Sequence, residues 1–194
     1  MSSTWIQTFT GRCFDFTAPD PEVVCLDDIA HGLAHQCRFN GQCLHYYSVA
    51  EHSCLVAKRA VEIMLANQWG PDDMAVGKAA ALMHDASEAY IGDIVTPLRR
   101  ALVDAEALYR VESAVVAAVT QRFHLDTRPE VLDVVRQADL DLLAIEQRDI
   151  MAPAPQPWPG LMEIPSHTTV KTMGMSPPQA KLTFLRTAHH FGIA

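Results

Sequence analysis

The stretch SVAEHSCLVAKRAVEIMLANQW, residues 48–69, decides the fold class of this chain. It opens on Ser48, a residue type that caps helix N-termini, and it stops at Gly70-Pro71, a pair that ends helices. Within it, His52 shares one face with apolar residues three and four positions away. The pattern predicts a long amphipathic helix whose core-facing side carries one histidine.

Helical periodicity continues on both sides of this segment. Asp27-Asp28 is expected to cap a short helix, and Gly92 is expected to stop the helix that Pro71 begins. The remaining helices are predicted at residues 29–37, 71–90, 104–124, 130–151 and 177–191.

Other segments lack this periodicity. Residues 5–16 place β-branched and aromatic residues on both sides of Thr10-Gly11, which predicts a short hairpin. Loops are expected at residues 38–46, in the connector 93–100 and in the Pro-rich segment 152–167. The sequence therefore predicts an all-α single domain over residues 1–194 with a short N-terminal β-hairpin.

Composition excludes several classes of protein. A length of 194 residues fits about one domain, and 49% hydrophobic with 20% charged residues is a globular balance rather than a disordered one. The formal net charge of −8 argues against binding to duplex DNA or an anionic membrane through bulk charge. No apolar run reaches the roughly 20 residues of a membrane helix, and residues 1–10 lack a signal-peptide pattern.

The five cysteines form no C-x-x-C pair, which disfavours a zinc ribbon. Free thiols in a reducing cytoplasm are the simpler interpretation. We therefore expect a cytoplasmic protein whose partners include neither a nucleic-acid polymer nor a membrane.

Three segments carry ionisable side chains on apolar faces. His52 points to the core, where a histidine either bonds a backbone carbonyl or ligates a metal. In LMHDASEAYIGD, residues 82–93, His84 and Asp85 are adjacent and Glu88 lies on the same side of the expected helix. The alternative for this segment is a solvated polar helix end. In VVRQADLDLLAIE, residues 134–146, Asp139 lies in an apolar stripe, where an isolated carboxylate is costly, so a buried partner is expected.

Two imidazoles and two carboxylates from three helices together form one donor set: His52, His84, Asp85 and Asp139. This N₂O₂ set suits a divalent ion such as Mn, Co, Fe, Ni or Zn, with positions left for water and substrate. Glu146, two turns from Asp139 on the same side, is expected to support the ligands or the fold rather than to ligate. Asp141 lies off the stripe and is expected to be exposed or to bond locally.

The order His … His-Asp … Asp, within SVAEHS, ALMHDASEAYIGDI and ADLDLLAIEQRDIM, resembles the HD-domain metal-dependent phosphohydrolase superfamily. The likeness runs from about residue 28 to 151 and implies an HD-type helical bundle. Within the superfamily the chain is similar to the small nucleotide phosphohydrolases, namely bacterial deoxyribonucleoside 5′-monophosphatases and phage-type enzymes that strip triphosphate from dATP. It departs from larger dNTP triphosphohydrolases and cyclic-di-nucleotide phosphodiesterases, whose extra helices and, in the latter, further histidine ligands are not visible here.

The resemblance implies a role for each matched residue. The four donors would hold a divalent ion, with Co, Mn, Zn, Ni, Fe and Mg all left open. Glu88 would be the acid/base group, and Asp93 would help to orient the attacking water. The implied substrate-binding residues are Arg38 and Arg99 on the phosphate, and Phe39 and Pro97 beside the base. Three of them have a simpler alternative: a surface arginine for Arg38, a core anchor for Phe39 and a helix start for Pro97.

The implied function is hydrolysis of a deoxyribonucleotide, a small-molecule partner. Two reactions stay open: dNMP to nucleoside plus phosphate, or a dNTP such as dATP to nucleoside plus triphosphate. The alternative from another class is a catalytically silent nucleotide-binding module. A homo-oligomer is compatible with the resemblance. His31 and His35, four residues apart without an accompanying carboxylate motif, are expected to pack or to form a pocket wall. The Pro-rich segment 152–167 either covers the site or only connects.

Overall fold

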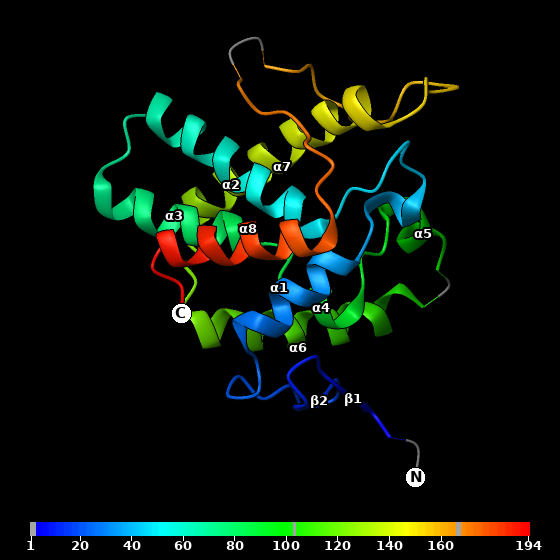
Figure 1. Cartoon of the computed structure of the whole chain (residues 1–194), viewed down its shortest axis with the longest axis vertical. Coiled ribbons are helices and arrows are strands. Elements are labelled where there is room, and N and C mark those ends of the chain that lie inside the picture. The colour runs from blue at the N-terminus through cyan, green and yellow to red at the C-terminus, as the bar shows by residue number, and fades with distance from the viewer. Residues whose placement is uncertain (1–2, 103, 166–167) are drawn as a thin grey trace.

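Helix α2 (Val49–Ala66) lies beside α7 in the computed structural model, which describes residues 3–102, 104–165 and 168–194 (Figure 1). It packs against α1, α3, α7 and α8. The predicted N-cap is confirmed, because the Ser48 side chain accepts the backbone N–H of Glu51 at 3.1 Å. The helix ends at Ala66, three residues before the end of the predicted segment. These contacts with four other helices make α2 the element against which the site is built.

The other elements follow in chain order. The helices are α1 (Leu26–His35), α3 (Pro71–Met83), α4 (Glu88–Ile91), α5 (Thr96–Ala101), α6 (Ala105–Phe123), α7 (Pro129–Ile150) and α8 (Pro177–His190), and η1 (Arg38–Gly41) is a single 3₁₀ turn. Strands β1 (Trp5–Gln7) and β2 (Cys13–Asp15) form an antiparallel hairpin in which Ile6 pairs with Phe14. The expectation of a mostly helical chain with a short N-terminal hairpin is confirmed. The helices assigned to 104–124, 130–151 and 177–191 are found within about one residue of their predicted ends.

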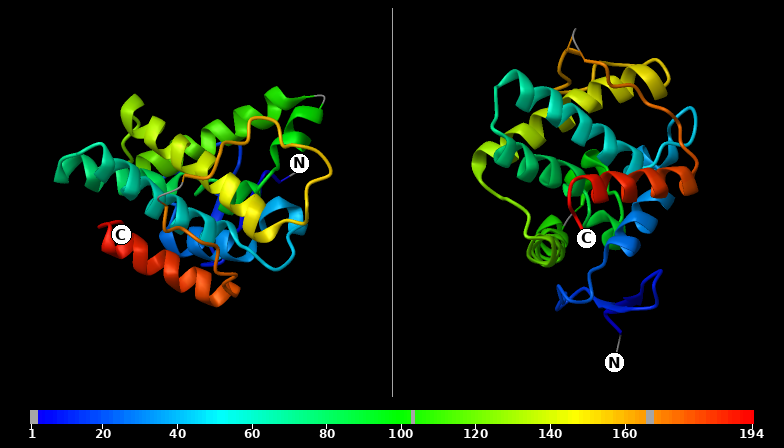
Figure 2. Two further views of the ribbon diagram at one scale, coloured as in Figure 1. Left: turned by 90° about the horizontal axis from the view of Figure 1, so that it is seen from above. Right: turned by 60° about the vertical axis from the view of Figure 1, so that its left-hand side comes forward.

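The hairpin lies at the opposite end of the molecule from α2 and α7 (Figures 1 and 2). Asp28 fixes it to α1, because its carboxylate accepts the backbone N–H of Thr10 at 2.7 Å and the Thr10 hydroxyl at 2.9 Å. The predicted capping role of Asp27-Asp28 is therefore wrong. Helix α1 already begins at Leu26, so both carboxylates lie inside its first turn, where they are favourable beside the helix dipole.

His31 and His35 pack, as expected. The ring of His31 stacks on Phe9 at 3.8 Å and on His35 at 4.1 Å between centroids. The Nδ1 atom of His35 donates to the carbonyl of His31 at 2.8 Å. The pair therefore joins the hairpin to α1.

The helix predicted over residues 71–90 is interrupted, and this prediction is wrong in a way that matters for the site. Helix α3 ends at Met83, four residues of turn follow, and α4 begins at Glu88. Through the turn, backbone N–H groups bond carbonyls three residues back, as from Ala86 to Met83 at 3.0 Å. Sequence periodicity continues across the break, so it could not reveal the tighter winding. Gly92 ends α4 at a φ of +89°, as its predicted stop role requires.

The connector over 93–100 also differs from expectation, because it contains α5. Pro97 stands in the first turn of this helix, where its missing N–H leaves no hydrogen bond unmade. In the described part of residues 152–167 the chain forms no helix or strand, as predicted.

An ion pair links α2 and α7 inside the core. Arg59 donates through Nε to Asp141 at 2.7 Å, and both side chains are nearly inaccessible. Asp141 also accepts from the Gln137 side chain at 2.8 Å. Of the two alternatives expected for Asp141, the local hydrogen bond is found and exposure is not, because Arg59, from another helix, compensates its charge in the core.

Two carboxylates of α2 accept hydrogen bonds from the segment before α8 and hold it against α2. Glu51, which is fully buried, accepts the backbone N–H groups of Met173, Gly174 and Met175 at 2.5, 3.0 and 2.7 Å. Three turns further on, Glu62 accepts from the side chains of Thr168 and Thr169 at 2.9 and 2.8 Å. These contacts fix residues 168–176, which we call the strap, against α2.

No helix among the described residues is long and apolar enough to cross a membrane. The five cysteines are free thiols in the described structure, as the sequence suggested.

Replacing Glu51 by Ala is expected to lower the free energy of unfolding by about 2–4 kcal/mol, because three backbone N–H groups lose their charged acceptor and a buried side chain is removed. Chemical denaturation in a chelator-containing buffer measures this. The exposed Glu130→Ala, at the start of α7, is the matched control and should stay within about 0.5 kcal/mol of wild type. An unchanged midpoint for Glu51→Ala would show that the strap contributes little stability.

Glu62 predicts a pH dependence of stability. Burial would raise its pKa, but Arg59 and the hydrogen bonds from Thr169 outweigh burial and lower the pKa to about 2. The unfolded carboxyl therefore takes up a proton before the folded one does, so this stabilisation is complete above pH 4.5 and is lost between about 4.5 and 2. As the pH falls from about 4.5 to 2, the difference in unfolding free energy between wild type and Glu62→Gln should therefore shrink. A difference independent of pH would contradict the assignment.

Candidate metal centre

His52 enters the site from α2 with no exposed surface. Its Nδ1 atom lies 2.6 Å from Oε1 of Glu146 in α7. Burial would raise the pKa of Glu146, but Arg38 and His52 keep this pKa below its usual value, so the carboxylate accepts and Nδ1 donates. The Nε2 atom is buried with no hydrogen-bond partner among the described residues. The ring is thus fixed at one nitrogen and free at the other.

His84 has the same arrangement at the end of α3. Its Nδ1 donates to the carbonyl of Ala81 at 2.8 Å, an oxygen that can only accept. Its Nε2 is buried and, within the ranges described, has no hydrogen-bond partner. Because α3 stops at Met83, Asp85, which follows His84, can turn its side chain toward Nε2 of His84.

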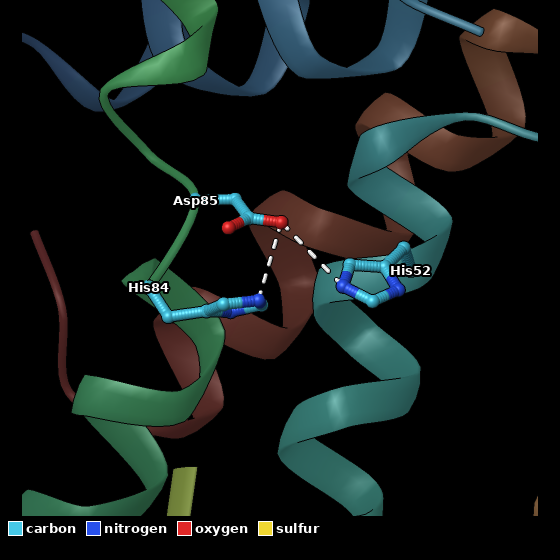
Figure 3. A group of neighbouring side chains, drawn as sticks. All are labelled: His52, His84 and Asp85. Atoms are coloured by element: carbon cyan, nitrogen blue, oxygen red, sulfur yellow. Dashed lines mark ion pairs between the residues drawn. The ribbon is translucent and has the colours of Figure 1, made fainter. Parts of the chain in front are cut away.

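Asp85 joins the two imidazoles. Its Oδ2 atom lies 3.2 Å from Nε2 of His84 and 3.4 Å from Nε2 of His52 (Figure 3). One ligand atom from each of the three residues lies within 4.8 Å of the others, and we call these three residues the metal group. His52 comes from α2, whereas His84 and Asp85 come from the turn after α3 (Figure 3). The structure therefore brings together three of the four predicted ligands.

Asp139, the fourth predicted ligand, borders this group from α7. Its Oδ1 atom lies 3.2 Å from Nε2 of His52, which is the buried partner that the sequence required. Its side chain is 44% exposed, so Asp139 lies at the edge of the apolar stripe rather than within it. Burial would raise its pKa, but the nearby imidazoles of His52 and His84 lower the pKa instead.

The charges around the metal group are strongly coupled. Burial would lower the pKa of His84, yet the negative charge of Asp85 outweighs burial and raises this pKa to about 9. For Asp85, burial opposes ionisation, but His84, His52 and Arg38 hold its pKa well below the usual range. Arg38 lies 3.7 Å from Asp85 and 3.2 Å from Glu146. Asp85 and Glu146 are thus ionised, and their negative charges favour a positively charged group or ion nearby.

These residues fit a divalent cation. With neutral imidazoles, three carboxylates and one guanidinium leave two negative charges at this point. Metal-binding histidines usually donate their second ring N–H to a carboxylate or a backbone carbonyl, which is what Nδ1 of His52 and of His84 do. Two imidazole nitrogens with carboxylate oxygens suit Mn, Co, Fe, Ni or Zn. The metal group could therefore hold such an ion.

The two residues predicted to be catalytic bracket α4. Burial and the charges of Asp85 and Asp93 raise the pKa of Glu88 to about 9, and its Oε2 is buried without a partner in the described structure. Burial also raises the pKa of Asp93, although Arg38 opposes this. The side chain of Gln36 holds both ends of this helix, donating to the carbonyl of Glu88 at 2.7 Å and accepting the N–H of Asp93 at 2.9 Å.

The predicted substrate-binding residues divide into two sets. Arg38, 12% exposed, lies at the metal group, and its guanidinium lies 5.3 Å from the centre of the Phe39 ring. Phe39 also packs against the core, so both of its predicted roles stay open. Arg99 instead forms an ion pair with Glu112 of α6, and Pro97 is exposed on α5. Their proposed contacts with substrate stay predictions.

One residue of the site and one contact within it had no sequence signal. Gln36 follows the end of α1 and shows no pattern that indicates its contacts with α4. The pairing of Arg38 with Glu146 spans 108 residues, beyond any local spacing. Glu146 itself was expected beside the ligands, and the spacing of two turns from Asp139 was the signal that found it.

No protein-family model matches the chain. It is 34% identical to the protein named "Uncharacterized protein YfdR" of Escherichia coli strain K12, over 94% of this chain and 92% of that protein. It is 30% identical to "Uncharacterized protein RCAP_rcc00048" of Rhodobacter capsulatus, over 98% of this chain and 95% of that protein. The similarity therefore extends along nearly the whole of each chain.

Replacing Asp85 by Asn should remove tight binding of Mn or Co, because the group that joins both imidazoles loses its charge. Elemental analysis after dialysis against the metal measures stoichiometry directly. Asp133→Asn, an exposed carboxylate of α7, is the control and should retain the wild-type metal content. Full metal content in Asp85→Asn would refute the ligand assignment.

Proposed function

Because this chain belongs to the same family as YfdR and RCAP_rcc00048, both named as uncharacterized, we propose its function from the site itself. It is a metal-dependent phosphohydrolase with the HD-type arrangement of ligands, and its substrate is a small deoxyribonucleotide. The observation that carries the proposal is the convergence of two orphaned histidine nitrogens on Asp85 with an arginine beside it. When bound, the ion supplies Lewis-acid chemistry, making water more acidic and polarising a phosphoryl oxygen.

Arg38 is the residue that binds phosphate. Burial would lower its pKa, but Glu146 and Asp85 raise it, so the guanidinium keeps its charge at every relevant pH. Its Nε is buried with no hydrogen-bond partner in the described ranges, which leaves one N–H for a phosphate oxygen. A charged donor in such a site stabilises the negative charge that grows on the leaving oxygen.

Glu88 and Asp93 handle protons and water. The unpartnered Oε2 of Glu88 is available to exchange a proton with water or with the leaving group. Asp93 faces the same charges from the other end of α4, and its carboxylate orients the attacking water. Gln36 keeps the two residues at a constant separation by bonding both ends of that helix.

The experiment that tests this function separates products. Purified protein with Co or Mn is incubated with all dNMPs and dNTPs, and nucleoside, phosphate and triphosphate are resolved by chromatography. Nucleoside plus phosphate identifies a 5′-monophosphatase, whereas nucleoside plus triphosphate identifies a triphosphohydrolase. No product from any substrate would overturn the proposal and favour the silent nucleotide-binding module.

In the active protein, Glu88→Gln is expected to reduce kcat by about 10²–10⁴-fold, because the side chain can no longer exchange a proton. Its metal content should stay at the wild-type level, since Glu88 is not in the metal group. Steady-state kinetics and elemental analysis on the same preparation check both statements. Glu130→Gln is the exposed control, and equal kcat in the two variants would remove Glu88 from the mechanism.

A further inference from the structure

The loop between α7 and α8 is closed at its base. Asp149, near the end of α7, accepts the backbone N–H and the hydroxyl of Thr172, both at 3.4 Å. The carbonyl of Ile150 accepts the N–H of Leu44 at 2.8 Å. Figure 1 shows the loop, yellow to orange, leaving α7 and returning toward α8. Its two ends are therefore held close together and against the segment that follows η1.

The returning half of the loop is the strap, which Glu51 and Glu62 fix to α2. Gly174 makes the close approach possible. It has a φ of +66°, and a Cβ there would meet the ring of His45 at 3.0 Å. These contacts fix the base of the loop and its returning half, and the loop residues before that half include one aromatic side chain.

One of those residues, Trp158, reaches the site. Its ring lies 5.8 Å from that of Phe39 between centroids, with the planes tilted by 53°. The Arg38 guanidinium in turn lies 5.3 Å from the Phe39 ring and 3.7 Å from the Asp85 carboxylate. Trp158 is thus separated from the metal group by two side chains, although it is 119 residues from Phe39 in sequence.

The two aromatic residues are held in place. Phe39 has a φ of +54°, a left-handed conformation that is uncommon for a residue of this size, and its ring packs against the core. Trp158 is half-buried between two exposed prolines, whose fixed φ stiffens the loop at that point. An indole held in advance loses little entropy when it contacts a ligand.

We propose that Trp158 favours nucleotides over base-free phosphates by contacting, with Phe39, the planar base of the nucleotide whose phosphate Arg38 binds. This inference rests on the proposed function. The metal group, Arg38, Phe39 and Trp158 contact one another in that order. In a nucleotide, the phosphate would lie at the metal group and Arg38, and the base would lie at the two aromatic rings. Base–aromatic contact tolerates different bases, because every base has a π-face.

Binding measured apart from turnover tests the inference. Calorimetry uses the Mn-loaded Glu88→Gln protein with each dNMP and dNTP, and with the matching base-free compounds, deoxyribose 5-phosphate and inorganic triphosphate. Adding Trp158→Ala should raise the Kd for the preferred nucleotide about ten-fold and leave the Kd for its base-free match within about two-fold. Trp158→Phe should restore most of the affinity, and Gln156→Ala, an exposed residue of the same loop, should change neither Kd.

Each contrary outcome is distinguishable. Equal weakening of nucleotide and base-free compound, or no change in either, would overturn the contact between Trp158 and the base. If the wild type hydrolyses no nucleotide but nucleotide binding still depends on Trp158, the contact is supported and the proposed function is overturned. If the parent protein binds no nucleotide, the proposed base site does not exist.

Discussion

Where α2 crosses α7, the buried carboxylate of Glu146 accepts hydrogen bonds from His52 and from Arg38, and much of the site depends on these two contacts. A carboxylate without exposed surface is stable only if its charge is compensated, and removal of one partner from such a buried set is strongly destabilising. The same bond places the proton of His52 on Nδ1, so that Nε2 faces the metal group. One interaction therefore serves both packing and the chemistry of the site.

The break between α3 and α4 has a comparable double effect. A continuous helix would turn His84 and Asp85 about 100° apart, so their side chains would diverge. In the turn they meet, with Nε2 of His84 and Oδ2 of Asp85 3.2 Å apart. The accumulated negative charge is unfavourable unless protons or a cation compensate it, which is why the pKa of His84 is raised and why a divalent ion fits. The local backbone and the local charge thus favour the same chemistry.

The loop after α7, which has no regular structure, is also held by buried or half-buried carboxylates. Two carboxylates of α2, Glu51 and Glu62, supply acceptors that the strap cannot provide for itself. Because Glu51 precedes His52 directly, the helix that positions a ligand also positions the loop that carries Trp158. The proposed recognition of phosphate and base would then depend on one rigid element.

The sequence by itself determined most of the helices, the hairpin and the identity of the candidate ligands. Caps such as Ser48, stops such as Gly92 and apolar spacing act over a few residues, so they can be read locally. His52 and Asp139 stood out for the same reason, as polar side chains on apolar faces. The interruption after Met83 was decided by tertiary structure, since the spacing on either side of it is compatible with one helix. The burial of Asp141, the bridge from Arg38 to Glu146 and the contact of Trp158 with Phe39 were also decided there. Each of these depends on two segments far apart in the chain, and only their packing brings the charges and rings within reach of one another.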